Sequence, residues 1–104
     1  MTHNEREALL ASRLSPDYIG VGPVFATPTK AIPDPVLGSE RMGSIIRSSP
    51  VPAVALGGID RGNLADVLRH GARNFCVVRA VTRRPDPETA IRELQNIWRQ
   101  ETGL

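Results

Sequence analysis

The chain has 104 residues, of which 40% are hydrophobic, and its 13 basic and 11 acidic side chains give a formal net charge of +2. This length suits one globular domain, and this hydrophobic share excludes a disordered chain. The basic residues are scattered along the sequence and only four residues are aromatic, so nucleic-acid binding has weak support.

Cysteine content and hydropathy exclude several further classes of protein. Cys76 is the only cysteine, which excludes an internal disulfide and a multi-cysteine metal site. It stands in the apolar run 75–78, where we expect a buried side chain. No stretch approaches the roughly 20 apolar residues of a membrane span. Residues 1–7 have no apolar signal core, so we expect a cytoplasmic protein.

In chain order, the pattern predicts helices that alternate with strands. Thr2 and Glu5 fit a capping box before a first helix, which Ser15 and Pro16 end. Residues 18–25 are apolar or glycine apart from one tyrosine hydroxyl, which is typical of a parallel strand buried on both faces. The later expected elements are a loop at 26–37, a helix at 39–47, a strand at 53–56, a helix from Asp60 to His70 with Gly71 after it, a strand at 75–78, and a helix begun by Asp86 and Pro87.

Each predicted helix carries an apolar stripe that should face the sheet. The stripe residues are Met42, Ile45 and Ile46, then Leu64, Val67 and Leu68, and finally Ala90, Ile91, Leu94, Ile97 and Trp98. The order of elements indicates an α/β fold with about three parallel strands and right-handed crossovers. Three strands leave two open edges, so we expect a homo-oligomer or a missing amino-terminal half to complete the core.

The first strand is followed by polar residues that suit a phosphate ligand. Thr27 and Thr29 offer hydroxyl donors, Lys30 offers an ammonium group, and Pro28 gives a rigid turn between them. Ligands bind at the carboxyl ends of parallel strands, which is where this loop stands. An ordinary surface turn with a solvated lysine is the alternative interpretation.

The second and third strands are also followed by candidate anion-binding residues. Gly57 and Gly58 precede a predicted helix, so their backbone N–H groups can approach an anion; a simple tight turn is the alternative. Arg79 follows the third strand and can clamp a phosphate, or it can pair with a neighbouring helix. Because parallel strands end at one edge of a sheet, the three loops together predict a shared phosphate site. The acidic residues show no paired spacing that favours a metal site.

Four segments of the sequence closely resemble the carboxyl-terminal part of thiamine-phosphate synthase. They are DYIGVGPVFATPTK at 17–30, ALGGI at 55–59, Gly71-Ala72, and VVRAV at 77–81. The first segment is highly specific, and the resemblance spans nearly the whole chain. The related thiazole tautomerase is expected to have histidine in place of Pro23, so Gly22-Pro23 favours the synthase.

The resemblance implies that residues 1–104 form the last strands and helices of a (β/α)₈ TIM barrel. Enzymes of this family join hydroxymethylpyrimidine diphosphate to thiazole phosphate and release diphosphate, with Mg²⁺ on the diphosphate. The implied substrate-binding residues are Thr27, Pro28, Thr29, Lys30, Gly58, Val78 and Arg79. Lys30 is the implied catalytic residue because it contacts the diphosphate, whereas Gly58, Val78 and Arg79 contact the thiazole phosphate.

The resemblance also implies that parts of the active site lie upstream of this chain. The segments that bind Mg²⁺ and the pyrimidine precede the matched region in this family, so their ligands are expected outside residues 1–104. Small phosphorylated substrates are the expected partners, without nucleic acid or membrane. The alternative function is a non-catalytic phosphate-binding or regulatory half-barrel that associates with itself.

Overall fold

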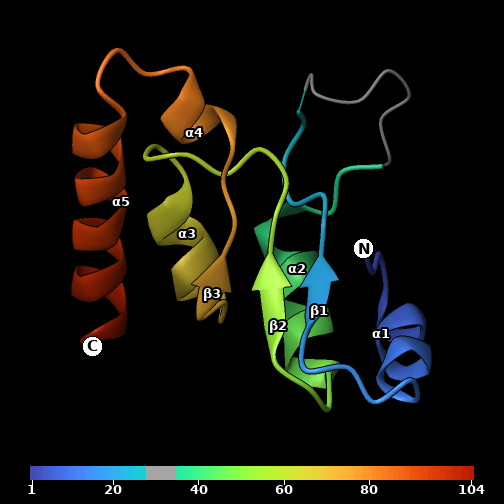
Figure 1. The fold of residues 1–104 in the computed structure, drawn as a ribbon. Coiled ribbons are helices and arrows are strands. Elements are labelled where there is room, and N and C mark those ends of the chain that lie inside the picture. Colours follow the sequence, from blue (N-terminus) through green and yellow to red (C-terminus); the bar gives the residue numbers. More distant parts are fainter. Residues whose placement is uncertain (28–34) are drawn as a thin grey trace.

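The computed structural model describes residues 1–27 and 35–104, in which helices alternate with parallel strands (Figure 1). The elements in chain order are α1 (Glu5–Ser12), β1 (Ile19–Val21), α2 (Gly38–Ser48), β2 (Ala53–Ala55), α3 (Leu64–Arg69), β3 (Asn74–Phe75), α4 (Arg79–Thr82) and α5 (Pro87–Thr102). Residues 28–34 of the predicted loop lie outside the described residues.

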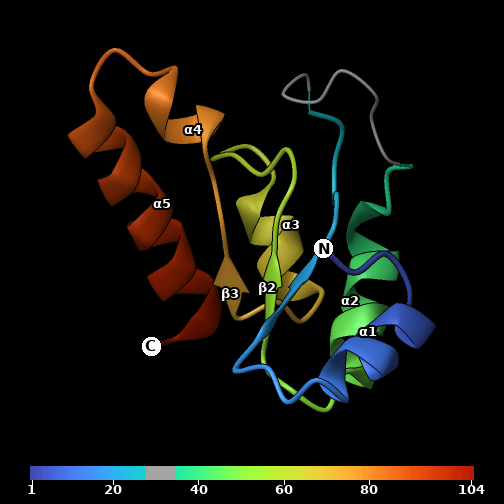
Figure 2. The ribbon, with the colours of Figure 1, turned by 45° about the vertical axis from the view of Figure 1, so that its right-hand side comes forward.

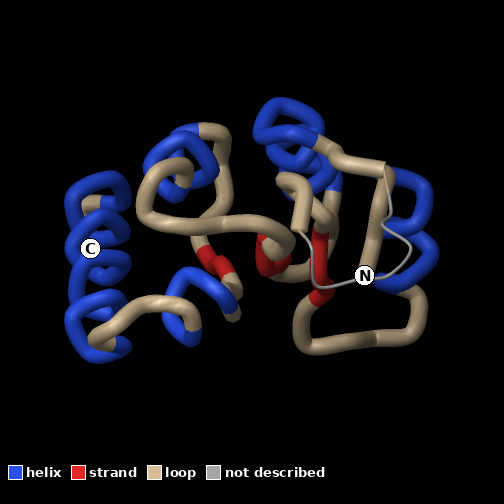
Figure 3. The backbone as a smooth tube through the Cα atoms, turned by 90° about the horizontal axis from the view of Figure 1, so that it is seen from above, coloured by secondary structure: helices blue, strands red, loops and turns tan. Residues whose placement is uncertain are grey.

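The three strands form one parallel sheet in the order β1-β2-β3, as predicted. Ile19 pairs with Ala53 at the start of β1, and Ala55 pairs with Phe75 at the end of β3. Helices α2 and α3 lie on one side of the row of strands, while α1 and α5 lie at its two ends (Figures 1 and 3). The carboxyl ends of all three strands consequently open toward the same edge of the molecule.

The strands are shorter than their apolar runs, and their burial alternates. Ile19 and Val21 are buried, Gly20 is half-buried, and Tyr18 is exposed. Residues 21–24 are buried in succession, so the predicted burial on both faces holds for the carboxyl-terminal half of the run 18–25 and fails at Tyr18. Sheet-like hydrogen bonding nevertheless continues past the strand end, since Val24 N–H donates to the Leu56 carbonyl at 3.0 Å.

The amino-terminal residues form a backbone bridge rather than the predicted capping box. Thr2 N–H donates to the Gly20 carbonyl at 2.6 Å, and Gly22 N–H donates to the Thr2 carbonyl at 3.1 Å. Asn4 caps α1 instead, because its side-chain oxygen accepts from Glu7 N–H at 2.8 Å. The Thr2 hydroxyl donates to the Gly20 carbonyl at 2.6 Å, so the buried Thr2 side chain is held against β1 instead of capping the helix. Figure 2 shows this segment running up to β1.

Asp60 makes the contacts of a capping residue, as predicted, although α3 begins later, at Leu64. Its carboxylate accepts from Gly62 N–H at 2.8 Å, and its carbonyl accepts from Leu64 N–H at 2.9 Å. Asn63 directly precedes the helix, but its side chain makes no capping hydrogen bond to it. Two further predicted helix ends are confirmed. Gly71 follows α3 with a left-handed φ of +112°, and Asp86 accepts from Thr89 N–H directly before Pro87.

The apolar stripes of the helices build the core between the sheet and α2, α3 and α5. Met42, Ile45, Leu64 and Val67 are fully buried, and Leu94 is 4% exposed. Ile46, Ile97 and Trp98 are partly buried against this core. The prediction is wrong for Ile91, which is 44% exposed.

The burial predicted for Cys76 is also wrong. Its thiol is exposed, although its N–H donates to the Ala55 carbonyl at 2.9 Å and so continues the β2–β3 pairing. Cys76 is one of the residues that line a cavity at the carboxyl ends of the strands. Within the described residues, no helix combines the length and the apolar character that crossing a bilayer requires.

Candidate phosphate-binding cavity

The described residues enclose a broad cavity of about 1120 Å³ at the carboxyl ends of the strands. All three strand-to-helix loops contribute to its wall. Phe25 and Thr27 come from the loop after β1, Gly57 and Gly58 from the loop after β2, and Val78 and neighbouring residues from the loop after β3. The cavity therefore lies where ligands bind in parallel α/β folds.

The structure brings together the candidate residues that it describes. Thr27, Gly58, Val78 and Arg79 all line the cavity, although they are spread over more than half of the sequence. Pro28, Thr29 and Lys30 lie outside the described residues. The convergence that the sequence predicted for the three loops thus holds for one residue of the first loop and for both later loops.

The two glycines of the second loop are required by close packing against the first loop. A Cβ on Gly57, whose φ is +104°, would stand 2.6 Å from Pro23 Cα. A Cβ on Gly58, whose φ is +66°, would stand 2.6 Å from the Ala26 carbonyl oxygen. Real Cβ atoms do not make contacts this short, so only glycine at these two positions allows the two loops to pack this closely.

Gly58 is not directly before a helix, contrary to the prediction. Five residues separate it from Leu64, where α3 begins, because the Asp60 turn stands between them. The Gly58 carbonyl instead accepts from the Asn63 side-chain amide at 3.0 Å. The helix dipole of α3 consequently contributes little to the electrostatic potential at Gly58. An anion near Gly58 would be bound by backbone N–H groups.

The third loop turns at Val78 into α4, a short helix that the sequence did not predict. Val78 is 60% exposed in the cavity wall, and its carbonyl accepts from Thr82 N–H at 2.9 Å. Arg79 is the first residue of α4. The first N–H groups of a helix have no acceptor within it, so this turn presents backbone donors beside the Arg79 side chain.

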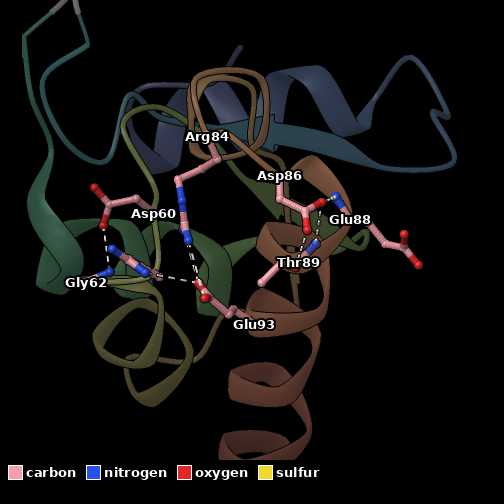
Figure 4. A network of polar contacts seen from close by, with 8 residues as sticks. Asp60, Gly62, Arg84, Asp86, Glu88, Thr89 and Glu93 are labelled. Carbon is pink, nitrogen blue, oxygen red and sulfur yellow. Dashed lines mark hydrogen bonds and ion pairs between the residues drawn. The ribbon is translucent and has the colours of Figure 1, made fainter.

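A cluster of charged residues at the cavity wall was missed by reasoning from the sequence. Arg84 donates from Nη1 and Nη2 to the two oxygens of Glu93 at 3.1 and 3.3 Å, and Arg61 donates to Glu93 Oε2 at 3.3 Å (Figure 4). Hydrogen bonds from Arg84 are the main cause that lowers the pKa of Glu93 below its ordinary value. Sequence separations of 9 and 32 residues give no helical or strand spacing that signals these pairs.

The family resemblance implies a Mg²⁺ site whose ligands lie outside residues 1–104. Across residues 1–27 and 35–104, no three His, Cys, Asp or Glu side chains gather closely enough to hold a metal ion. A divalent cation of this kind is bound through carboxylates and phosphate oxygens. Among the described residues, the cavity wall offers hydrogen-bond donors and the guanidinium groups of Arg61, Arg79 and Arg84.

Comparison with known sequences places the chain among synthases of thiamine phosphate. A family model described as thiamine monophosphate synthase matches residues 1–81. The chain is 44% identical to a thiamine-phosphate synthase of Chloroflexus aurantiacus over 89% of its own length and 43% of that protein. It is 40% identical to the Archaeoglobus fulgidus thiamine-phosphate synthase, covering 97% of this chain and 48% of the relative.

Solved structures agree with the sequence comparison. A thiamine phosphate pyrophosphorylase from Pyrococcus furiosus superposes with a TM-score of 0.86 and 34% identity, covering 98% of this chain and 48% of that one. An orotidine 5'-phosphate decarboxylase from Pyrococcus horikoshii, at 21% identity and a TM-score of 0.63, shares the fold. The predicted architecture, three parallel strands with flanking helices as part of a TIM-barrel-like fold, is confirmed.

The chain spans about half the length of the relatives that it matches. Within that half, the family model covers the three strands and the loops that build the cavity. The chain belongs to the thiamine monophosphate synthase family.

Proposed function

We propose that residues 1–104 are the carboxyl-terminal portion of a thiamine-phosphate synthase, which joins hydroxymethylpyrimidine diphosphate to thiazole phosphate and releases diphosphate. The observation that carries this proposal is the convergence of Thr27, Gly58, Val78 and Arg79 on one cavity at the carboxyl ends of three parallel strands. The reaction is inferred from family membership, and the cavity is the proposed binding site for the phosphorylated substrates.

The proposed contribution of this chain is to bind and orient the thiazole phosphate. The Thr27 hydroxyl donates to an anionic oxygen, while the backbone at Gly58 and Val78 and the guanidinium of Arg79 neutralise the phosphate. Fixing the thiazole ring in this way places its nitrogen for attack on the pyrimidine carbon as the diphosphate departs. Positioning of this kind removes much of the entropic barrier to a reaction between two substrates.

The diphosphate is proposed to be bound by the first loop and by groups outside this chain. Lys30 is the proposed catalytic residue because an ammonium group stabilises the negative charge that develops on a leaving diphosphate. Pro28 and Thr29 belong to the same proposed substrate-binding loop. Mg²⁺ ligands are proposed to lie on the remainder of the enzyme. A cytoplasmic location is part of this proposal, because multiply charged phosphates do not cross a bilayer unaided.

The missing part of the barrel is proposed to cover the open face of the sheet. Among the described residues β3 pairs only with β2, which leaves its outer edge for another strand. Leu56, Val77 and Val78 line the cavity, and Val78 is 60% exposed. Such an apolar wall beside an open strand edge is stabilised when further strands close over it.

A second candidate function rests on the same open face. A second copy of the chain could cover it, which would give a phosphate-binding or regulatory half-barrel that self-associates without catalysis. Symmetric pairing of identical surfaces is the commonest mode of protein association. The two functions differ in whether an amino-terminal half restores turnover.

The test combines binding with complementation. Thiazole phosphate is titrated calorimetrically into the chain alone, and diphosphate release is then measured after mixing with the amino-terminal half of the Archaeoglobus fulgidus relative. Turnover in the mixture is the expected result. Binding by a dimer of the chain with no turnover favours the half-barrel function instead. Absence of both binding and turnover in a folded mixture contradicts both functions.

A further inference from the structure

The cavity wall contains a charged cluster that the proposed site does not include. We call Arg61, Arg84 and Glu93 the Glu93 cluster. Arg61 lies in the loop after β2, Arg84 follows α4, and Glu93 lies in α5. Its three contacts measure 3.1 to 3.3 Å, and Figure 4 shows the Arg84 and Glu93 side chains pointing toward each other. The cluster thereby joins the second and third cavity loops through one carboxylate.

The two arginines and the carboxylate differ in their relation to the cavity. Arg61 and Arg84 line it together with Gly58 and Arg79, whereas Glu93 is absent from its lining. Both arginines that contact Glu93 thus line the cavity, while the carboxylate that binds them does not. The Arg84 side chain is 26% exposed and the Glu93 side chain 34%, so their contact is partly shielded from water.

The geometry of Arg84 leaves donors for a ligand. A guanidinium group carries five N–H donors in a rigid plane. The contacts to Glu93 use one donor from each Nη nitrogen. Because the group is planar, a carboxylate bound along one edge also determines the direction of the remaining donors. A phosphate held by the Gly58 and Val78 loops is a ligand that such donors recognise.

We propose that Arg84 is an additional phosphate-binding residue and that Glu93 is its positioning residue. The ligand group is the phosphomonoester of the thiazole substrate, so the inference rests on the proposed function. Arg61 adds positive charge to the same carboxylate and the same wall. Removal of Glu93 leaves Arg84 free to rotate, and ordering it again on binding costs conformational entropy.

The test compares matched variants by calorimetric titration of thiazole phosphate and, separately, of inorganic phosphate. The variants are Arg84→Gln, Glu93→Gln, the double variant and Arg84→Lys, each measured alone and with the amino-terminal half of the Archaeoglobus fulgidus relative. Arg92→Gln is the control, because Arg92 lies on α5, pairs with Glu88 at 2.6 Å and does not line the cavity. Circular dichroism melting establishes that every variant is folded.

Arg84→Gln should weaken thiazole phosphate binding about tenfold or more, because charge-assisted hydrogen bonds are lost. Arg84→Lys should restore part of this loss, because it keeps the charge without the planar fork. Glu93→Gln should weaken binding in the wild-type background and should have no further effect beside Arg84→Gln. A role for Glu93 in folding alone would not produce this dependence on Arg84.

The alternative outcomes separate the two proposals. Unchanged binding by Arg84→Gln, or tighter binding by Glu93→Gln, overturns this inference while the proposed function stands. Binding of inorganic phosphate that depends on Arg84, without binding of thiazole phosphate, retains the anion-binding role and overturns the proposed function. Binding of neither ligand by the folded chain, alone or with the amino-terminal half, overturns both.

Discussion

Gly57 lies so close to Pro23 that a Cβ on the glycine would stand 2.6 Å from the Pro23 Cα. The contact locks the second cavity loop against the first, and Phe25 N–H donates to the Gly57 carbonyl at 2.9 Å across the same junction. The mutual placement of Thr27 and Gly58 in the cavity therefore depends on a backbone contact that involves no polar side chain.

Gly57→Ala should destabilise the protein by about 2 kcal/mol or more, since it combines a positive φ with a clash against backbone. The measurement is urea unfolding followed by circular dichroism. Gly38→Ala is the control, because Gly38 has a φ of +78° and a Cβ there meets nothing within 4 Å. It should cost only about 1 kcal/mol. An equal loss of unfolding free energy in the two variants would contradict the close packing between Gly57 and Pro23.

Asn4→Ala should destabilise the protein by about 1 kcal/mol, the usual effect of losing a helix N-cap. The Asn4 side-chain oxygen accepts from Glu7 N–H, and alanine has no acceptor to replace it. Asn4→Asp is the matched control, because aspartate keeps the acceptor and should retain the stability of the wild type. Urea unfolding gives both values, and a neutral Asn4→Ala change would contradict the cap assignment.

Cys76 should react with a thiol reagent in the folded chain, because its side chain is exposed in the open cavity. It is the only cysteine, so a colorimetric reagent reports this position alone. The expected rate is close to that of the unfolded chain, and closure of the barrel by an amino-terminal half should slow it. A thiol that reacts only after unfolding would contradict the observed exposure.

The stability contributed by Glu93 should depend on pH in a defined direction. Hydrogen bonds from Arg84 lower the pKa of Glu93 in the folded chain below its ordinary value of 4.5. The unfolded state therefore binds the proton more readily, so the contribution is present above pH 4.5 and is lost as the pH falls through the folded pKa. Because the pair is partly exposed, we expect a small effect that salt reduces.

Chemical denaturation between neutral and acidic pH measures this dependence for the wild type and Glu93→Gln. The wild type should lose more stability than the variant as the pH is lowered, because glutamine does not titrate. Glu88→Gln on the exposed face of α5 controls for the removal of a carboxylate from the same helix. Parallel pH curves for the wild type and Glu93→Gln would refute the coupling between Glu93 and Arg84.

The sequence by itself determined the α/β alternation, the parallel sheet and the cap at Asp86, and its motifs identified the family. These features follow from local rules. The turn chemistry and cap preferences act within a few residues of chain, and the order of strands and helices limits the connections that can join them. The placement of candidate residues after the strands was predictable because parallel strands all end at one edge.

Only the tertiary structure decided which side chains meet. Asn63 directly precedes α3, but its side-chain amide donates to the Gly58 carbonyl of the second cavity loop and makes no cap. Cys76 lies in an apolar run but is exposed, because it lines the cavity at the carboxyl ends of the strands. Glu93 contacts Arg61 across 32 positions of sequence. Such contacts depend on how α5 packs against α3, a long-range arrangement that no local pattern encodes.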